Sequence, residues 1–313
     1  MKLSLVVPCY NEEGNVEAFT EQARKILQGI EYEIIFINDG SKDGTIRKLK
    51  EIKKESKDNM TIINFSRNFG KEAGMYAGLQ HVNGEYAVII DADLQQPIEV
   101  AREMYEFLEE NEEYDGVAAY QEQRKEGKVL TAFKSVFYGL INKLSDVKFY
   151  RNASDFRCLR RNVVEAILQM SEYHRFSKGI FAWIGFNMYY RPYQVRERNA
   201  GTTSWSFWKL LNYAIEGMIS FSTKPLRAVT TLGIGTSAIA ILYMIIVILQ
   251  KIFLGNDVPG YPTIIVLILL LGGIQLTVLG IIGEYLAKVH IEVKNRPIYI
   301  AKEVIRGEKV SEE

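Results

Sequence analysis

Two long stretches without a charged residue limit what this chain can fold into. They run from Ala228 to Leu249 and from Thr263 to Gly283. The hydrocarbon core of a bilayer is about 30 Å thick and is crossed by about 20 helical residues, so each stretch is long enough to span it. A pair of buried helices in a soluble core is the alternative, although such helices rarely run this long without a charge. The sequence therefore predicts two transmembrane helices.

Basic residues lie on the outer sides of this pair of stretches, whereas the loop between them offers only Lys251. Lys209, Lys224 and Arg227 precede the first stretch, and Lys288, Lys294 and Arg296 follow the second. The positive-inside rule then predicts that both ends of the chain are cytoplasmic. The segment 205–225 is rich in aromatic residues and amphipathic, so we expect it along the membrane surface; an ordinary core helix would show the same pattern.

The first 120 residues alternate short β-rich runs with longer amphipathic ones, which is typical of parallel βαβ units. The expected strands are Lys2–Val7, Glu33–Asn38, Met60–Asn64, Tyr86–Ile90 and Val117–Ala119, and the expected helices are Gly14–Gly29, Gly44–Ser56, Lys71–Val82 and Pro97–Glu110. We expect an α/β fold with a Rossmann-like, mostly parallel sheet. The predicted organisation is a cytosolic domain (1–204), an amphipathic segment (205–225), two transmembrane helices (226–285) and a cytosolic tail (286–313).

Composition excludes several classes of function. The chain has 38 basic and 38 acidic residues, so no net charge favours nucleic acid. Cys9 and Cys158 are far apart and lack a CxxC or Cys/His grouping, which argues against zinc and against a disulfide framework. The N-terminal apolar run is too short for a secretory signal, which fits a cytosolic domain. Any function must come from local clusters of residues.

Asp91 and Asp93 form the most informative cluster, because two like charges follow directly on an apolar strand. A divalent metal would relieve their repulsion. Mg²⁺ and Mn²⁺ prefer oxygen ligands and are often shared between one or two carboxylates and substrate phosphates. The pair, with Gln95 as a further oxygen donor, would hold the metal against a nucleotide diphosphate. The alternative is a polar turn in which Asp93 caps the helix beginning near Pro97.

Two other polar loops follow predicted strands, and ligands of open α/β sheets bind beyond the carboxyl ends of strands. Asp39 lies in Asn38-Asp-Gly-Ser and could accept hydrogen bonds from a base or a sugar. A simple turn with Ser41 or Asp43 as helix N-cap is the alternative there. Pro8-Cys-Tyr-Asn-Glu-Glu adds a third polar loop to the same edge of the sheet.

In combination, these motifs resemble the family 2 glycosyltransferases, whose nucleotide-sugar-binding domain has the GT-A fold. The motifs are Val7-Pro-Cys-Tyr-Asn-Glu-Glu, Asn38-Asp-Gly-Ser and Asp91-Ala-Asp-Leu-Gln. Three further segments resemble the polyprenyl-phosphate glycosyltransferases with two C-terminal membrane helices. They are Asp155-Phe-Arg-Cys-Leu-Arg-Arg, Arg191-Pro-Tyr through Arg198-Asn-Ala-Gly, and Gly283-Glu-Tyr-Leu through Lys294-Asn-Arg-Pro-Ile-Tyr. The resemblance covers nearly the whole chain.

The resemblance implies roles for individual residues. Asp39 would contact the base, Asp91 and Asp93 would bind metal and diphosphate, and Asp155 matches an acidic residue suggested as catalytic base. Ser204 stands where relatives carry a lysine near the acceptor phosphate, so another cation would have to replace that charge. Pro8, Tyr10, Asn11 and Glu12 are the further donor contacts, and Arg124, Lys134 and Arg198 are the candidate cations for the acceptor phosphate.

The expected activity is inverting, metal-dependent transfer of a sugar from a nucleotide-sugar, UDP-glucose in the first instance, to a polyprenyl phosphate such as undecaprenyl phosphate. N-acetylglucosamine, mannose and modified pentoses stay open as the sugar. The alternatives are a processive polysaccharide synthase, against which the missing Gln-x-x-Arg-Trp argues, and a non-catalytic nucleotide-binding subunit. Expected partners are the membrane, a second copy of the chain, and a downstream flippase or glycosyltransferase, with no nucleic acid.

Overall fold

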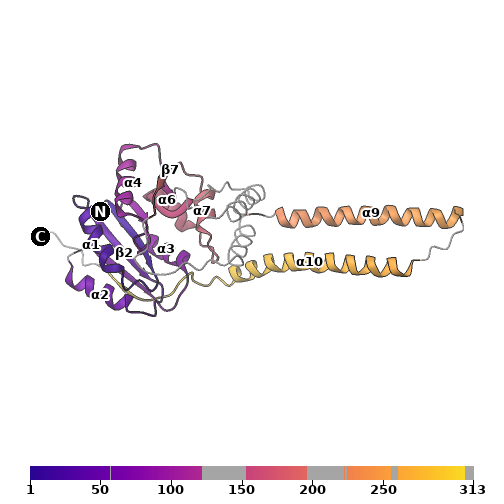
Figure 1. Cartoon of the computed structure of the whole chain (residues 1–313), viewed down its shortest axis with the longest axis horizontal. Helices are drawn as coiled ribbons and strands as arrows, with labels where there is room; N and C mark the ends of the chain where they lie inside the picture. The colour runs from indigo at the N-terminus through magenta and orange to yellow at the C-terminus, as the bar shows by residue number, and fades with distance from the viewer. Residues whose placement is uncertain (57, 122–152, 196–221, 223, 255–259, 307–313) are drawn as a thin grey trace.

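The computed structural model describes residues 1–56, 58–121, 153–195, 222, 224–254 and 260–306. An α/β body lies at one end of the molecule, and two long helices extend away from it side by side (Figure 1). Almost all of the segment 205–225 lies outside the described residues, so its predicted place on the membrane surface stays a prediction.

One mixed sheet runs through the body, with the described strands in the order β7-β5-β6-β4-β1-β2-β3-β8. The central strands β3, β2, β1 and β4 are parallel to one another, whereas β6 and β8 flank them in antiparallel pairing. The strands are β1 (Leu3–Cys9), β2 (Tyr32–Asn38), β3 (Met60–Phe65), β4 (Tyr86–Ile89), β5 (Gly116–Gln121), β6 (Ala153–Arg160), β7 (Met188–Tyr193) and β8 (Ala301–Ile305). The predicted α/β class is confirmed, with a parallel centre inside a mixed sheet.

Helices cover both faces of this sheet, which explains why the central strands are apolar at nearly every position. Residues of α1, α2 and α4 share one core with Leu3, Leu5 and Val7 of β1. Residues of α3, α6 and α7 share the other core with Val6, as expected when successive strand residues point to opposite faces. The helices are α1 (Val16–Ile26), α2 (Thr45–Glu55), α3 (Lys71–Gln80), α4 (Ile98–Glu110), α6 (Arg161–Gln169) and α7 (Ser177–Trp183).

The two long helices are α9 (Lys224–Leu254) and α10 (Tyr261–Val293), with 31 and 33 residues. At 1.5 Å per residue each is about 45–50 Å long, which exceeds the hydrocarbon thickness of a bilayer. Their most apolar windows are 0% buried inside the protein. Buried helices of a soluble core, the alternative considered for these stretches, are therefore excluded. The helices are long and apolar enough to cross a membrane.

The chain returns to the sheet after the second long helix, where the sequence predicted only a tail. β8 pairs antiparallel with β3, and the Ser66 N–H donates to the Ile300 carbonyl at 2.9 Å. Tyr299 stacks on Phe65 at 4.8 Å between ring centroids, and its hydroxyl donates to a side-chain oxygen of Gln80 at 2.7 Å. The C-terminal part of the chain thus closes the edge of the sheet that β3 would otherwise expose.

Candidate active site

Asp91 and Asp155 meet at a lysine that the sequence reasoning did not select. Lys71 begins α3, and its Nζ lies 2.6 Å from Oδ1 and 2.9 Å from Oδ2 of Asp91. The same Nζ lies 3.4 Å from Oδ2 of Asp155 in β6. Three elements far apart in sequence therefore bring two carboxylates to one ammonium group. The sequence feature that could have indicated Lys71 is its position directly after the loop that follows β3, at the same edge of the sheet as the other polar loops.

Gln96 fixes the Asp91 carboxylate from the other side. The Asp91 N–H donates to Oε1 of Gln96 at 2.9 Å, and Nε2 of Gln96 donates to Oδ2 of Asp91 at 3.1 Å. Gln96 is buried, whereas the predicted oxygen donor Gln95 donates its own backbone N–H to Oδ1 of Asp93 at 3.1 Å. No side chain caps α4, so the alternative role of Asp93 as its N-cap is not seen.

Charge and burial set the protonation of this cluster. Burial raises the pKa of Asp91, and the Lys71 ammonium offsets only part of that rise. Burial acts in the same direction on Asp155, but the charges of Lys71, Lys178 and Arg157 outweigh it and hold its pKa below the usual range. Burial lowers the pKa of Lys71, yet Asp91 and Asp155 more than compensate, so it is raised. Asp155 is thus an ionised carboxylate among cations at neutral pH.

Arg157 is a second cation of the site that the sequence reasoning left without a role. It follows Asp155 by two positions in β6, so both side chains lie on the same face of the sheet. Its side chain is buried, and its guanidinium carbon lies 4.1 Å above the Phe181 ring of α7. Burial lowers the pKa of Arg157 to about 10, while Asp155 opposes the shift. It stays charged at neutral pH.

Glu72, the residue after Lys71, joins α3 to the start of α7. The Ser177 N–H donates to Oε2 of Glu72 at 3.1 Å, and the Ser177 hydroxyl donates to the same oxygen. Burial first, and the nearby charge of Asp155 second, raise the pKa of Glu72 to about 7. These two consecutive residues thus have different roles. Lys71 binds the carboxylates of Asp91 and Asp155, and Glu72 binds the first residue of α7.

Asp39 anchors the loop that leads to Lys71. Its carboxylate accepts the Phe69 N–H at 2.6 Å and the Gly70 N–H at 2.9 Å, and the residue is only 4% exposed. Gly70 has φ 95°, a left-handed conformation that glycine adopts without strain. Burial raises the pKa of Asp39 despite these two hydrogen bonds. The predicted base contact is therefore also a structural clamp.

The first polar loop packs against the second. Oδ1 of Asn11 accepts the Lys42 N–H at 2.9 Å, and the Asn11 N–H donates to Ser41 Oγ at 2.9 Å. Glu12 Oε2 accepts a hydrogen bond from Nδ2 of Asn15 at 2.6 Å. The remaining predicted donor contacts are Pro8, within β1, and Tyr10, which is 42% exposed.

Not every predicted site residue can be placed. Arg124, Lys134, Arg198 and Ser204 lie outside the described residues. Within the described ranges, no group of three or more His, Cys, Asp or Glu side chains is arranged to hold a metal ion. Both cysteines are buried and free, in keeping with the absence of a disulfide framework. A metal ion bound by Asp91 and Asp93 would therefore need further ligands from a substrate or from water.

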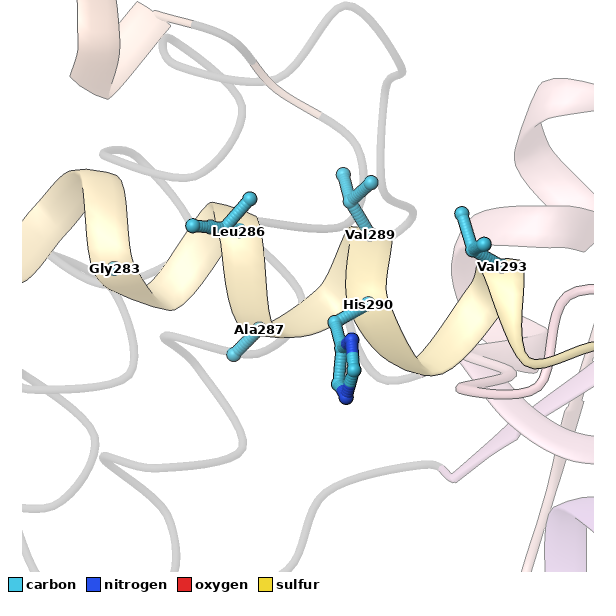
Figure 2. A pocket seen from close by; sticks show the side chains of 6 residues that line it. All are labelled: Gly283, Leu286, Ala287, Val289, His290 and Val293. Carbon is cyan, nitrogen blue, oxygen red and sulfur yellow. The ribbon is translucent and has the colours of Figure 1, made fainter.

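An apolar hollow lies on the last turns of α10 (Figure 2). It is lined by Gly283, Leu286, Ala287, Val289, His290 and Val293. Leu286 is 65% exposed and Val293 is 77% exposed, so apolar surface continues to the end of the helix. The hollow has no carboxylate among its lining residues. The hollow is therefore distinct in its lining from the cluster of Asp91, Asp155 and Lys71.

Comparison with known proteins defines the class. Residues 4–168 match the glycosyl transferase family 2 model, and residues 224–289 match the GtrB C-terminal hairpin model. The chain belongs to glycosyltransferase family 2 and is a glycosyltransferase with a membrane-associated C-terminal hairpin. The family that the sequence motifs predicted is therefore confirmed.

Individual relatives are similar over nearly their whole length. The putative glycosyltransferase CsbB of Bacillus subtilis is 43% identical over 96% of this chain and 91% of its own. The SfII prophage-derived bactoprenol glucosyl transferase of Shigella flexneri is 42% identical over 98% and 99%. The prophage bactoprenol glucosyl transferase homolog of Escherichia coli is 43% identical over 97% and 99%.

Proposed function

We propose that this chain transfers glucose from UDP-glucose to undecaprenyl phosphate, with inversion at the anomeric carbon, on the cytoplasmic side of the inner membrane. Relatives that are similar over 98–99% of their own length are named bactoprenol glucosyl transferases, which supports both the sugar and the lipid. The two long apolar helices supply the membrane association that such an acceptor requires.

The observation that carries the proposal is the meeting of Asp91 and Asp155 at Lys71. Both proposed substrates are anionic, so the site must hold negative charge without repelling it. A cluster of carboxylates and cations does this, because Arg157 and Lys178 add their positive charges to that of Lys71 near Asp155. Such an arrangement suits a reaction in which a diphosphate leaves while a phosphate attacks.

The residues present fit a divalent metal shared with the donor. Asp91 and Asp93 offer carboxylate oxygens at the carboxyl end of β4, and Gln95 is the further oxygen donor that we propose. Mg²⁺ and Mn²⁺ bind in this way, through one or two carboxylates together with substrate phosphates. The bound metal would stabilise the negative charge that develops on the departing diphosphate.

We assign Asp155 to orientation and charge balance rather than to proton removal. A phosphate monoester has its second ionisation near pH 6, so the lipid phosphate arrives largely charged and needs no strong base. A carboxylate whose pKa lies below the usual range is a poor proton acceptor. On the donor side, Asp39 reads the base while its carboxylate also holds the loop before Lys71.

The membrane hairpin would set the catalytic body at the height of the lipid headgroup. The uncharged stretch of α10 ends at Gly283, and the last ten residues of the helix, which extend about 15 Å, carry the first charges. The Tyr173 N–H donates to the Glu292 carboxylate at 3.2 Å, which ties this end of the helix to the segment before α7. Lys288 and Lys294 support the cytoplasmic orientation that we propose.

The test is transfer of label from radioactive UDP-sugars to undecaprenyl phosphate in nanodiscs with Mg²⁺ or Mn²⁺. UDP-glucose should label an organic-extractable lipid, and UDP-N-acetylglucosamine, GDP-mannose and UDP-pentoses provide the competing donors. Asp93→Ala should reduce transfer by at least about a hundredfold, since it removes charge stabilisation at the diphosphate. Glu165→Ala, which removes an exposed carboxylate of α6, is the control. Transfer by Asp93→Ala at the wild-type rate would refute the proposal.

A further inference from the structure

We infer that Lys71 is a donor-site residue with two alternative partners. Without metal its ammonium group holds Asp91 and Asp155 together, and when metal and donor bind it moves to the donor diphosphate. The inference rests on the proposed function, from which it takes the metal and the diphosphate. It assigns a role to a residue outside the motifs that identified the site.

The contacts of Asp91 are the first step. Lys71 Nζ lies 2.6 Å from Oδ1 and 2.9 Å from Oδ2, so one ammonium group engages both carboxylate oxygens. Distances of this size are typical of charge-assisted hydrogen bonds. Gln96 adds a third contact at 3.1 Å to Oδ2. The oxygens through which a metal would bind are therefore facing a cation of the protein.

A metal and this ammonium group exclude each other at Asp91. Mg²⁺ binds carboxylate oxygens at about 2.0–2.1 Å and carries two positive charges. An ammonium group that stayed within hydrogen-bonding distance of the same oxygens would lie close to a like charge and be repelled by it. Metal binding therefore requires that Lys71 leave Asp91, and the ion pair weakens metal binding until it does.

The structure allows the side chain to move while its backbone stays in place. Asp39 holds the N–H groups of Phe69 and Gly70, which fixes the chain immediately before Lys71. The Lys71 side chain is 41% exposed, and a lysine stem has four flexible methylene groups. The donor diphosphate, bound through the metal beside Asp91, would be the nearest new anion. It provides the second partner for the ammonium group.

This exchange makes metal and donor binding cooperative. The diphosphate would strengthen metal binding in two ways. It ligates the metal directly, and it draws Lys71 away from Asp91, which frees the Asp91 oxygens for the metal. By thermodynamic linkage the metal strengthens diphosphate binding by the same factor. Removal of the ammonium group should therefore have two opposite effects, tighter binding of metal alone and weaker coupling between metal and diphosphate.

The experiment measures Mn²⁺ affinity by electron paramagnetic resonance on the full chain in nanodiscs, with and without UDP. Lys71→Met should bind Mn²⁺ alone about tenfold more tightly than wild type, and the factor by which UDP tightens Mn²⁺ binding should fall about tenfold. Lys71→Gln carries the same expectation if the methionine variant does not fold. Lys48→Met is the matched control and should behave as wild type. It removes a lysine of α2 whose Nζ lies 2.8 Å from Oε2 of Glu17 in α1.

Two results would overturn the inference and are distinguishable. If Lys71→Met and Lys71→Gln keep the wild-type coupling while Asp91→Asn abolishes Mn²⁺ binding, the metal site stands and only the role of Lys71 fails. If Asp91→Asn leaves Mn²⁺ binding unchanged, the metal site of the proposed function fails, and the role of Lys71 fails with it.

Discussion

Glu72 gives the protein a pH dependence of stability whose size follows from its surroundings. Its carboxylate is largely buried beside Asp155, which raises its pKa from an ordinary 4.5 to about 7. In this range the folded state binds a proton that the unfolded state has released, so the free energy of unfolding falls as pH rises from about 4.5 to 7. The change corresponds to about 3 kcal/mol for this group, and it is complete above pH 8.

Glu72→Gln removes this titration and keeps the shape of the side chain. At pH 5 the wild-type carboxyl is largely protonated in the folded state, so the two proteins should have similar stability apart from a constant offset. At pH 8 wild type carries the full cost of the buried charge. About 2.5 kcal/mol of the change falls between pH 5 and pH 8, so the difference in Tm between variant and wild type should grow by roughly 5–10 °C in favour of glutamine, at 2–4 °C per kcal/mol.

Thermal unfolding of both proteins in detergent, at pH 5 and at pH 8, measures how the Tm difference between Glu72→Gln and wild type changes with pH. Titration of every other group is common to both proteins and cancels. Glu85→Gln, which changes an exposed carboxylate beside Lys2, is the control and should shift Tm by under about 1 °C. An equal Tm difference between Glu72→Gln and wild type at both pH values would refute the reasoning.

Three further predictions concern packing and hydrogen bonding. Gly78→Ala should lower the free energy of unfolding by about 1–3 kcal/mol, because its Cβ would lie 2.3 Å from Val6 Cγ1, whereas Gly14→Ala has open space and should change little in the same thermal assay. Arg160→Met should cost about 3 kcal/mol by chemical denaturation, since it leaves three backbone carbonyls without this donor. Asp39→Asn should lower the free energy of unfolding by about 1–3 kcal/mol, because an amide has one acceptor oxygen for two buried N–H groups. It should also weaken UDP binding measured by calorimetry, and unchanged affinity would contradict this.

The sequence predicts the central strands well because burial on both faces makes each of them a continuous apolar run. β6 escaped prediction for the opposite reason. Ser154, Asp155 and Arg157 interrupt its apolar residues, and its partner β4 lies more than sixty residues earlier. β8 is short and mostly exposed, and its five residues show neither a continuous apolar run nor a regular alternation of apolar and polar residues. Pairing between distant segments, and not local preference, makes these residues strands.

The candidate site shows the same limit. Asp39, Asp91 and Asp155 were found because they follow or begin strands, or because their motifs resemble a known family. Lys71 and Glu72 were not found, since a charged residue in the first turn of a helix usually faces water. Their roles depend on contacts with residues 20 and 105 positions away, which no local pattern contains.

The C-terminal strand has a consequence for how the protein is made. β3 leaves the ribosome early, but β8, which covers its edge, follows only after α9 and α10 have been synthesised. The newly made body therefore has an open strand edge until both helices and β8 have been synthesised, and such edges can pair with other chains. A chain shortened before the hairpin would lack β8 and keep this edge of β3 open permanently, so aggregation of an otherwise folded body is the expected defect.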